Sequence, residues 1–138
     1  GDLYCWGRSA LGALGTGWPD KVLKPLRITV KSDDAWPQQV AAAGEITCVR
    51  MTDGSVQCAG DNSSGALARD VEAEPYGLVF ARAAGFSGHA VRVATAAKAV
   101  CALLKDGNVE CWGSNANGEL GQGTTDRDPH PTPVSVRF

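Results

Sequence analysis

The chain has 138 residues, of which 43% are hydrophobic and 20% are charged, with a formal net charge of −2. This is the composition and length of one ordinary globular domain. The slightly acidic balance argues against a basic nucleic-acid-binding module or a polybasic membrane binder. No apolar run approaches the ~20 residues that a membrane-spanning helix needs. The 17 glycines predict many tight turns between short elements.

The cysteines reveal an internal repeat. Cys5, Cys58 and Cys111 follow one another at intervals of 53 residues, and the same interval separates Cys48 from Cys101. The flanking sequences repeat as well, as CWGRSALGALG at 5–15, CAGDNSSGALA at 58–68 and CWGSNANGELG at 111–121. A fixed period of about this size is typical of repeat architectures. We therefore interpret residues 1–138 as one repeat domain with phases 1–53, 54–106 and 107–138.

Four short strands are predicted within one period, over residues 16–68. Residues 26–30 alternate between apolar and polar side chains, and 39–43, 46–51 and 55–59 follow as short segments separated by turn-forming residues. The alanine-rich stretches 41–43 and 94–99 leave a helix as the less favoured alternative, because glycine or β-branched residues flank them.

Four strands per ~50 residues are typical of a β-propeller blade. The predicted fold is therefore all-β, built of four-stranded antiparallel sheets, as a partial propeller of about two and a half blades. Because such a fragment leaves sheet faces and edges open, we expect it to self-associate or to pack against further blades of a longer chain.

Two three-residue turns place cysteines opposite one another. Residues 52–54 and 105–107 both end in Asp-Gly, which suits a type I turn closed by a glycine with positive φ. Counting outward from each turn makes the two cysteines of each hairpin a non-hydrogen-bonded pair, with Cα atoms about 4.5 Å apart. This spacing is at the close end of disulfide geometry. The predicted disulfides are Cys48–Cys58 and Cys101–Cys111, with Cys5 unpaired.

Other uses of the cysteines are less well supported by the sequence. A zinc site is disfavoured because there is no C-x2-C pair and only His89 and His130 could add imidazole ligands. A catalytic thiol is disfavoured because no histidine recurs beside a cysteine. Buried reduced cysteines remain the alternative. Disulfides would place the protein in an oxidising location: secreted, periplasmic or at the cell surface.

The motif at 111–125, CWGSNANGELGQGTT, resembles the W-G-x-N-x-x-G-Q-L-G-x-G-T signature of regulator of chromosome condensation repeats. Residues 40–44 and 47–49 are similar to another segment of that repeat, although Ile46 stands where the family has histidine. The second copy departs from the motif at Ala59 and Ala68. The resemblance covers essentially the whole chain, and the paired cysteines resemble the secreted bacterial branch of the family.

The resemblance implies a propeller of typically seven blades that serves as a binding platform. The expected function is a non-catalytic, extracytoplasmic protein-binding scaffold that needs no cofactor. A secreted inhibitor resembling the propeller β-lactamase inhibitor and a guanine nucleotide exchange factor for a small GTPase are the alternatives. The expected partner is a protein, not nucleic acid, and no membrane span is expected.

The signature residues have structural roles in this interpretation. Glycines would permit turns, leucines would fill the core, and the tryptophans would lie between blades. Off-motif aromatic residues are better candidates for binding, because Trp and Tyr are enriched in binding hot spots. The candidate protein-binding residues are Trp18 and Trp36, followed by Tyr76 and Phe86. The structural motif consists of Trp6, Gly7, Gly12, Leu14, Gly60, Gly65, Leu67, Trp112, Gly113, Gly118, Leu120 and Gly121.

Overall fold

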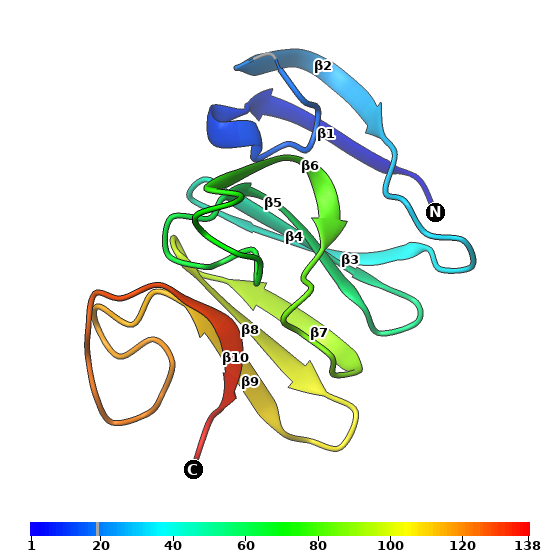
Figure 1. Ribbon diagram of the computed structural model, residues 1–138. Helices are drawn as coiled ribbons and strands as arrows, with labels where there is room; N and C mark the ends of the chain where they lie inside the picture. Colours follow the sequence, from blue (N-terminus) through cyan, green and yellow to red (C-terminus); the bar gives the residue numbers. More distant parts are fainter. Residues whose placement is uncertain (19) are drawn as a thin grey trace.

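A computed structural model describes residues 1–18 and 20–138 of the chain. Three antiparallel sheets follow one another along the sequence and fan out side by side (Figure 1). The first has two strands, and the other two have four strands in the orders β3-β4-β5-β6 and β7-β8-β9-β10. The elements are β1 (Leu3–Arg8), the short 3-10 helix η1 (Ala10–Gly12), β2 (Lys21–Ile28), β3 (Pro37–Ala43), β4 (Ile46–Met51), β5 (Val56–Asp61), β6 (Tyr76–Arg82), β7 (Ala90–Thr95), β8 (Ala99–Leu104), β9 (Val109–Gly113) and β10 (His130–Ser135). The predicted all-β partial propeller is confirmed, and the alanine-rich stretches lie in or beside strands.

The segment predicted as the strand 26–30 belongs to a different sheet from the one expected. Its first three residues form the end of β2, which pairs with β1 so that Cys5 lies opposite Leu26. The sheet that contains β4 and β5 instead starts at Pro37 and is completed by β6. The four strands predicted within residues 16–68 therefore do not form one blade. A sequence period fixes the spacing of equivalent strands, but it does not show which four consecutive strands share hydrogen bonds.

The hairpin register is the predicted one. Across the turn that follows β4, the Met51 amide donates to the Ser55 carbonyl at 2.9 Å, and Gly54 has φ +79°. Both disulfides are present, and in each of them the two Cα atoms are 4.1 Å apart. The bonded pairs are Cys48–Cys58, on β4 and β5, and Cys101–Cys111, on β8 and β9.

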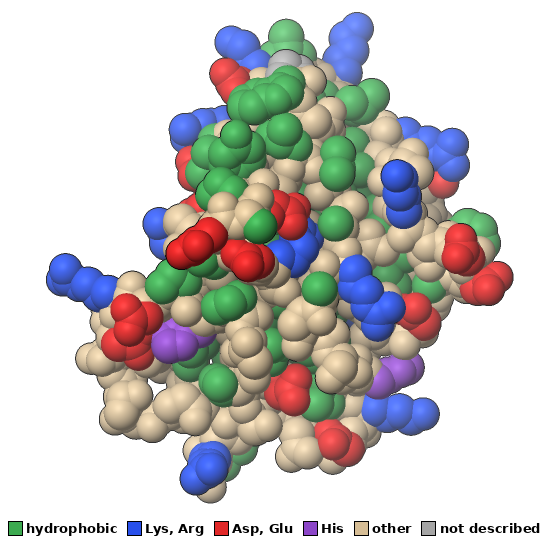
Figure 2. Space-filling model, in the orientation of Figure 1, with side chains coloured by type: hydrophobic (Ala, Val, Ile, Leu, Met, Phe, Trp, Pro, Cys, Tyr) green, Lys and Arg blue, Asp and Glu red, His purple; other side chains and the backbone are tan. Residues whose placement is uncertain are grey.

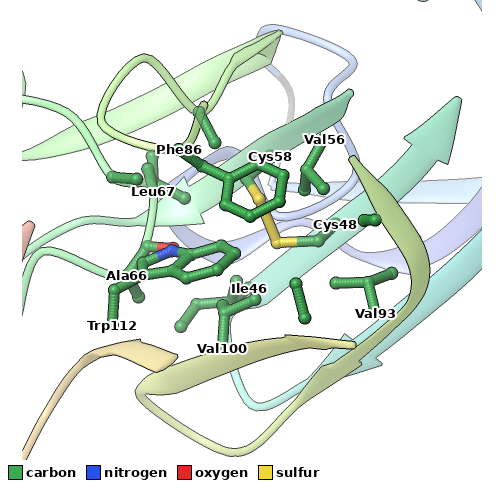
Figure 3. Close-up of a cluster of buried hydrophobic side chains, with 14 residues drawn as sticks. Ile46, Cys48, Val56, Cys58, Ala66, Leu67, Phe86, Val93, Val100 and Trp112 are labelled. Atoms are coloured by element: carbon green, nitrogen blue, oxygen red, sulfur yellow. A yellow bond between two sulfur atoms is a disulfide. The ribbon is translucent and has the colours of Figure 1, made fainter. Parts of the chain in front are cut away.

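The largest buried cluster lies between the two four-stranded sheets (Figure 3). Trp112 is fully buried there and stacks on Phe86, with ring centroids 5.4 Å apart. Its indole N–H donates to the carbonyl of Ala66 at 2.9 Å, so the one polar atom of the ring has a partner. The Cys48–Cys58 disulfide lies in the same cluster, on the face of the sheet that Trp112 approaches. Trp112 therefore packs between blades, as predicted.

Trp6 differs from this expectation. It occupies the same motif position as Trp112, but 60% of its surface is exposed. Its neighbour Cys5 points to the opposite face of the sheet, into a second cluster with Leu3, Ile28 and Phe80. In the part of the chain that the structure describes, no sheet lies on the Trp6 side of β1 and β2 (Figure 1). Most of the indole surface is therefore exposed to solvent.

Polar contacts also join neighbouring sheets. The Gln39 side chain on β3 donates to the Val93 carbonyl at 2.8 Å and accepts from the Val93 amide at 3.0 Å, so it pairs with β7 as a backbone amide would. Two ion pairs connect the sheets at one end of the strands. They are Arg8–Glu45, at 3.7 Å between the first and second sheets, and Asp61–Lys98, at 3.6 Å between the second and third.

Candidate protein-binding surface

The signature residues lie at the ends of the equivalent strands β1, β5 and β9 and in the loop that follows each of them. The first motif glycine has φ between +103° and +114° in all three copies, at Gly7, Gly60 and Gly113. The second has φ +82° at Gly12, Gly65 and Gly118. These are conformations that other residues rarely adopt. The motif leucines face inward: Leu67 and Leu120 are buried, and Leu14 is partly buried. This arrangement supports a structural role for the motif.

A buried polar residue that was not predicted from the sequence anchors each of these loops. The Asn62 side chain accepts from the Leu67 amide at 2.9 Å, and Asn115 accepts from the Leu120 amide at 3.4 Å. The first copy uses Ser9, whose hydroxyl accepts from the Leu14 amide at 3.4 Å. The signal was present in the sequence, because the three residues follow one another at the 53-residue interval.

Arg69 is another structural residue that sequence reasoning missed. Its side chain is only 8% exposed, and its Nη1 donates to the carbonyls of Cys58 at 3.1 Å and Ala81 at 2.9 Å, on β5 and β6. Glu74 lies 2.8 Å from its Nε. Burial lowers the pKa of Arg69, and the Glu74 carboxylate opposes that shift. Arg69 therefore joins two strands of one sheet and is not available as a surface charge.

The two candidate tryptophans lie at opposite ends of the strands and form no common site. Trp36 precedes β3 and is 64% exposed, and its amide donates to the Thr52 hydroxyl at 3.0 Å, beside the β4–β5 turn. Trp18 lies in the loop between β1 and β2, at the other end, and is 67% exposed. Phe86 is 2% exposed, so it belongs to the core.

Trp18 meets an aromatic residue from the neighbouring sheet. Its ring packs edge-to-face against Tyr76, with centroids 6.5 Å apart, and Tyr76 is 39% exposed at the start of β6. Leu11 in η1 is also exposed. Figure 2 shows hydrophobic side chains gathered over η1 and the start of β6 at the upper left of this face. We call Leu11, Trp18 and Tyr76 the aromatic end patch.

A shallow groove of about 450 Å³ runs beside the aromatic end patch. The Arg8–Glu45 ion pair lies on its wall, and Asp20 adds a further carboxylate. An exposed apolar centre with charged residues around it is the composition of a protein-binding surface. The groove is lined by Arg8, Ala10, Leu11, Trp18, Asp20 and Glu45.

Asp126 has a structural role in the loop between β9 and β10, where it is hydrogen-bonded to two side chains. Asp126 accepts from the Asn115 amide at 3.0 Å and lies 2.7 Å from His130 Nε2. These hydrogen bonds, the Asn115 bond first, lower the pKa of Asp126. They hold the loop between β9 and β10.

Among the described residues, no group of three histidine, cysteine, aspartate or glutamate side chains is placed to hold a metal ion. Over the same residues, no helix is long and apolar enough to span a membrane.

The three sheets share one sequence motif, with glycines and loop-anchoring residues at equivalent positions. The family model of the regulator of chromosome condensation (RCC1) repeat matches residues 1–50 and 106–138. The chain belongs to the RCC1 repeat family. The unmatched residues 51–105 contain the two departures from the motif, Ala59 and Ala68.

The proteins that resemble this chain are longer than it is. The ultraviolet-B receptor UVR8 of Arabidopsis thaliana is 33% identical over 130 residues, which cover 91% of this chain and 28% of UVR8. Yeast RCC1 (Prp20), in a crystal structure with Kap60, superposes with a TM-score of 0.85 at 17% identity, over 99% of this chain and 33% of that one. Human WBSCR16 gives a TM-score of 0.83 at 25% identity, over 97% of this chain and 34% of that one. The chain therefore spans about a third or less of the length of these relatives.

Proposed function

We propose that this RCC1 repeat protein is a non-catalytic scaffold that binds a protein partner through the aromatic end patch. The observation that supports this proposal best is the contact between Trp18 and Tyr76. The loop between β1 and β2 and the start of β6, in different sheets, bring these rings together, yet both remain exposed to solvent. Tryptophan and tyrosine contribute most to binding when a partner buries them, since each offers a large rigid surface at a small cost in side-chain entropy.

The chemistry around the patch favours a protein over a small molecule. The groove beside Trp18 is open, and its polar groups are two carboxylates and a guanidinium that already pairs with one of them at 3.7 Å. A small-molecule site usually encloses its ligand with a few convergent polar groups. The crystal structure of Prp20p from Saccharomyces cerevisiae, which superposes with a TM-score of 0.84 at 18% identity, was determined together with the binding properties of that protein to Gsp1p and histones. A propeller of this fold can therefore bind proteins.

The Trp18→Ala variant tests the proposal against a matched control. In a quantitative pull-down from the native source, we expect the wild-type chain and Trp36→Ala to retain a partner that Trp18→Ala loses. With the purified partner, the Kd should rise about 30-fold for Trp18→Ala, as for a hot-spot residue. Both tryptophans are about two-thirds exposed, so neither substitution should change the free energy of unfolding by more than about 0.5 kcal/mol.

Two results would contradict this assignment. One is equal retention of every captured protein by Trp18→Ala and the wild type, and the other is selective loss in Trp36→Ala. A panel that includes small GTPases and β-lactamases would separate the exchange-factor and inhibitor alternatives, through nucleotide release and residual hydrolysis respectively.

We also propose that the protein works in an oxidising compartment outside the cytoplasm. Two disulfides at equivalent positions support this, because such bonds persist mainly where thiols are not kept reduced. Alkylation of protein from its native source, without a reductant, should leave Cys48, Cys58, Cys101 and Cys111 unlabelled. Reduction should then expose four more thiols and lower the free energy of unfolding by about 2–3 kcal/mol per disulfide. Labelling of all five cysteines before reduction would contradict the proposal.

A further inference from the structure

The aromatic end patch lies at the more acidic end of the strands. This end is formed by the segments that follow β1, β5 and β9 or precede β4 and β8. These segments carry nine Asp and Glu residues against five Lys and Arg, over residues 8–18, 20–21, 44–45, 61–76, 97–98 and 113–130. The turns at the opposite end carry four against two, over residues 29–36, 52–55, 83–89 and 105–108. The excess of negative charge is therefore larger around the patch.

The groove beside Trp18 contributes one carboxylate that has no cationic partner. Of its two acidic residues, Glu45 pairs with Arg8 at 3.7 Å. The other, Asp20, is exposed and takes part in none of the ion pairs among the described residues. The Trp18 side chain is also mostly exposed, and the face of an indole ring attracts a cation. A Lys or Arg side chain of a partner would therefore find both an aromatic face and a carboxylate in this groove.

A second group of carboxylates lies on the other side of Tyr76, towards the third sheet. Asp70 and Glu72, in the loop that leads to Tyr76, line a groove together with Pro131 of β10. The Asp70 carboxylate accepts from the amides of Glu72 at 2.9 Å and Ala73 at 3.1 Å, which holds the turn in place. Both acidic residues are exposed, and neither joins an ion pair in the described part of the chain. Carboxylates without a cation therefore lie at both junctions between sheets.

Most of the basic residues at this end are already neutralised. Three of the five are paired with a carboxylate, as Arg8–Glu45, Arg69–Glu74 and Lys98–Asp61. The other two are Lys21 and Arg127, against six further acidic residues. A partner that brings positive charge to this end is therefore attracted, and an acidic partner is repelled.

We propose that the partner bound at the aromatic end patch docks through a basic segment, in which Lys or Arg alternates with apolar residues. Its apolar side chains cover Leu11 and Tyr76, one cation lies on Trp18 beside Asp20, and another approaches Asp70 and Glu72. This inference rests on the proposed function, because it specifies the chemistry of a protein that binds at the same patch.

The test uses the full chain and two eight-residue synthetic peptides. In the first peptide Lys or Arg alternates with Leu, and in the second Glu replaces each Lys and Arg. Binding is followed by NMR through the indole N–H signal of Trp18, which is assigned by its loss in Trp18→Ala. At low salt, we expect the basic peptide to shift this signal with a Kd at least about tenfold lower than that of the acidic peptide. Raising the salt concentration should weaken the binding.

Two double variants with the same change in charge locate the attraction. Asp20→Asn with Glu72→Gln should raise the Kd of the basic peptide about fivefold or more. Asp33→Asn with Asp34→Asn, at the opposite end, should leave it within about twofold. All four residues are exposed, so neither double variant should disturb the fold.

The inference would be overturned by equal affinity for the two peptides, by equal effects of the two double variants, or by the absence of any shift at Trp18. These results would leave the proposed function intact if Trp18→Ala still loses a captured protein. Retention of that protein by Trp18→Ala would instead contradict the proposed function itself.

Discussion

Replacing Gly60 by alanine should lower the free energy of unfolding by about 4 kcal/mol or more. Gly60 has φ +114°, and a Cβ on it would lie 1.9 Å from the carbonyl oxygen of Glu45. That carbonyl accepts the Asp61 amide at 2.8 Å, so relieving the clash would break a backbone hydrogen bond of the β4–β5 hairpin. Urea unfolding followed by circular dichroism would measure the loss.

Gly7 provides the matched control, because it has the same motif position and φ +108°. No atom lies within 4 Å of the Cβ that Gly7→Ala would add. That substitution should therefore cost only backbone strain, about 1–3 kcal/mol. Similar losses for the two variants would show that backbone conformation, and not the Glu45 carbonyl, makes the glycine necessary.

The second large effect is expected for Trp112→Ala, with a loss of about 3–5 kcal/mol. The substitution would remove the ring that fills the space between the two four-stranded sheets, together with its contact to Phe86. It would also leave the buried Ala66 carbonyl without its indole donor. Trp112→Phe keeps an aromatic ring, so it should lose less, mainly the cost of the missing hydrogen bond.

Trp6→Ala is the control for this prediction, because the same residue type at the same motif position is 60% exposed. It should change the free energy of unfolding of this chain by less than about 1 kcal/mol. A loss under 1 kcal/mol for Trp112→Ala, or equal losses at the two tryptophans, would contradict the packing of Trp112 between the two four-stranded sheets.

The sequence was sufficient for those features that depend on local geometry. The three-residue Asp-Gly turn and the two-residue period of a strand determine which cysteines face each other, and both predicted pairs are bonded. The period did not identify the partner of residues 26–30, because a repeat can be divided into sheets at more than one point. Trp6 shows a related limit, since its motif matches that of Trp112 and its exposure depends on whether another sheet lies against it.

The candidate site was harder to predict. Trp18 was singled out because it lies outside the motif, but its contact with Tyr76 depends on how loops of two sheets pack against each other. Trp36 met the same criterion and lies at the other end of the strands, so residue type alone could not define a patch. Arg69 gave no signal, because arginines are usually exposed and this one is buried by the strands that it joins.

The Arg8–Glu45 and Asp61–Lys98 pairs have a consequence for the order in which the sheets assemble. Arg8 and Asp61 occupy equivalent repeat positions, as do Glu45 and Lys98, so the polarity of the contact is reversed from one junction to the next. If the second sheet were omitted or exchanged, Arg8 would face Lys98, and two copies of the second sheet would bring Asp61 against Glu45. The exposed Arg8–Glu45 pair contributes only about 0–1 kcal/mol, whereas the Asp61 side chain of the second pair is buried. The effect of the two pairs is selective: like charges penalise the wrong neighbour and help equivalent sheets to stack in their proper sequence.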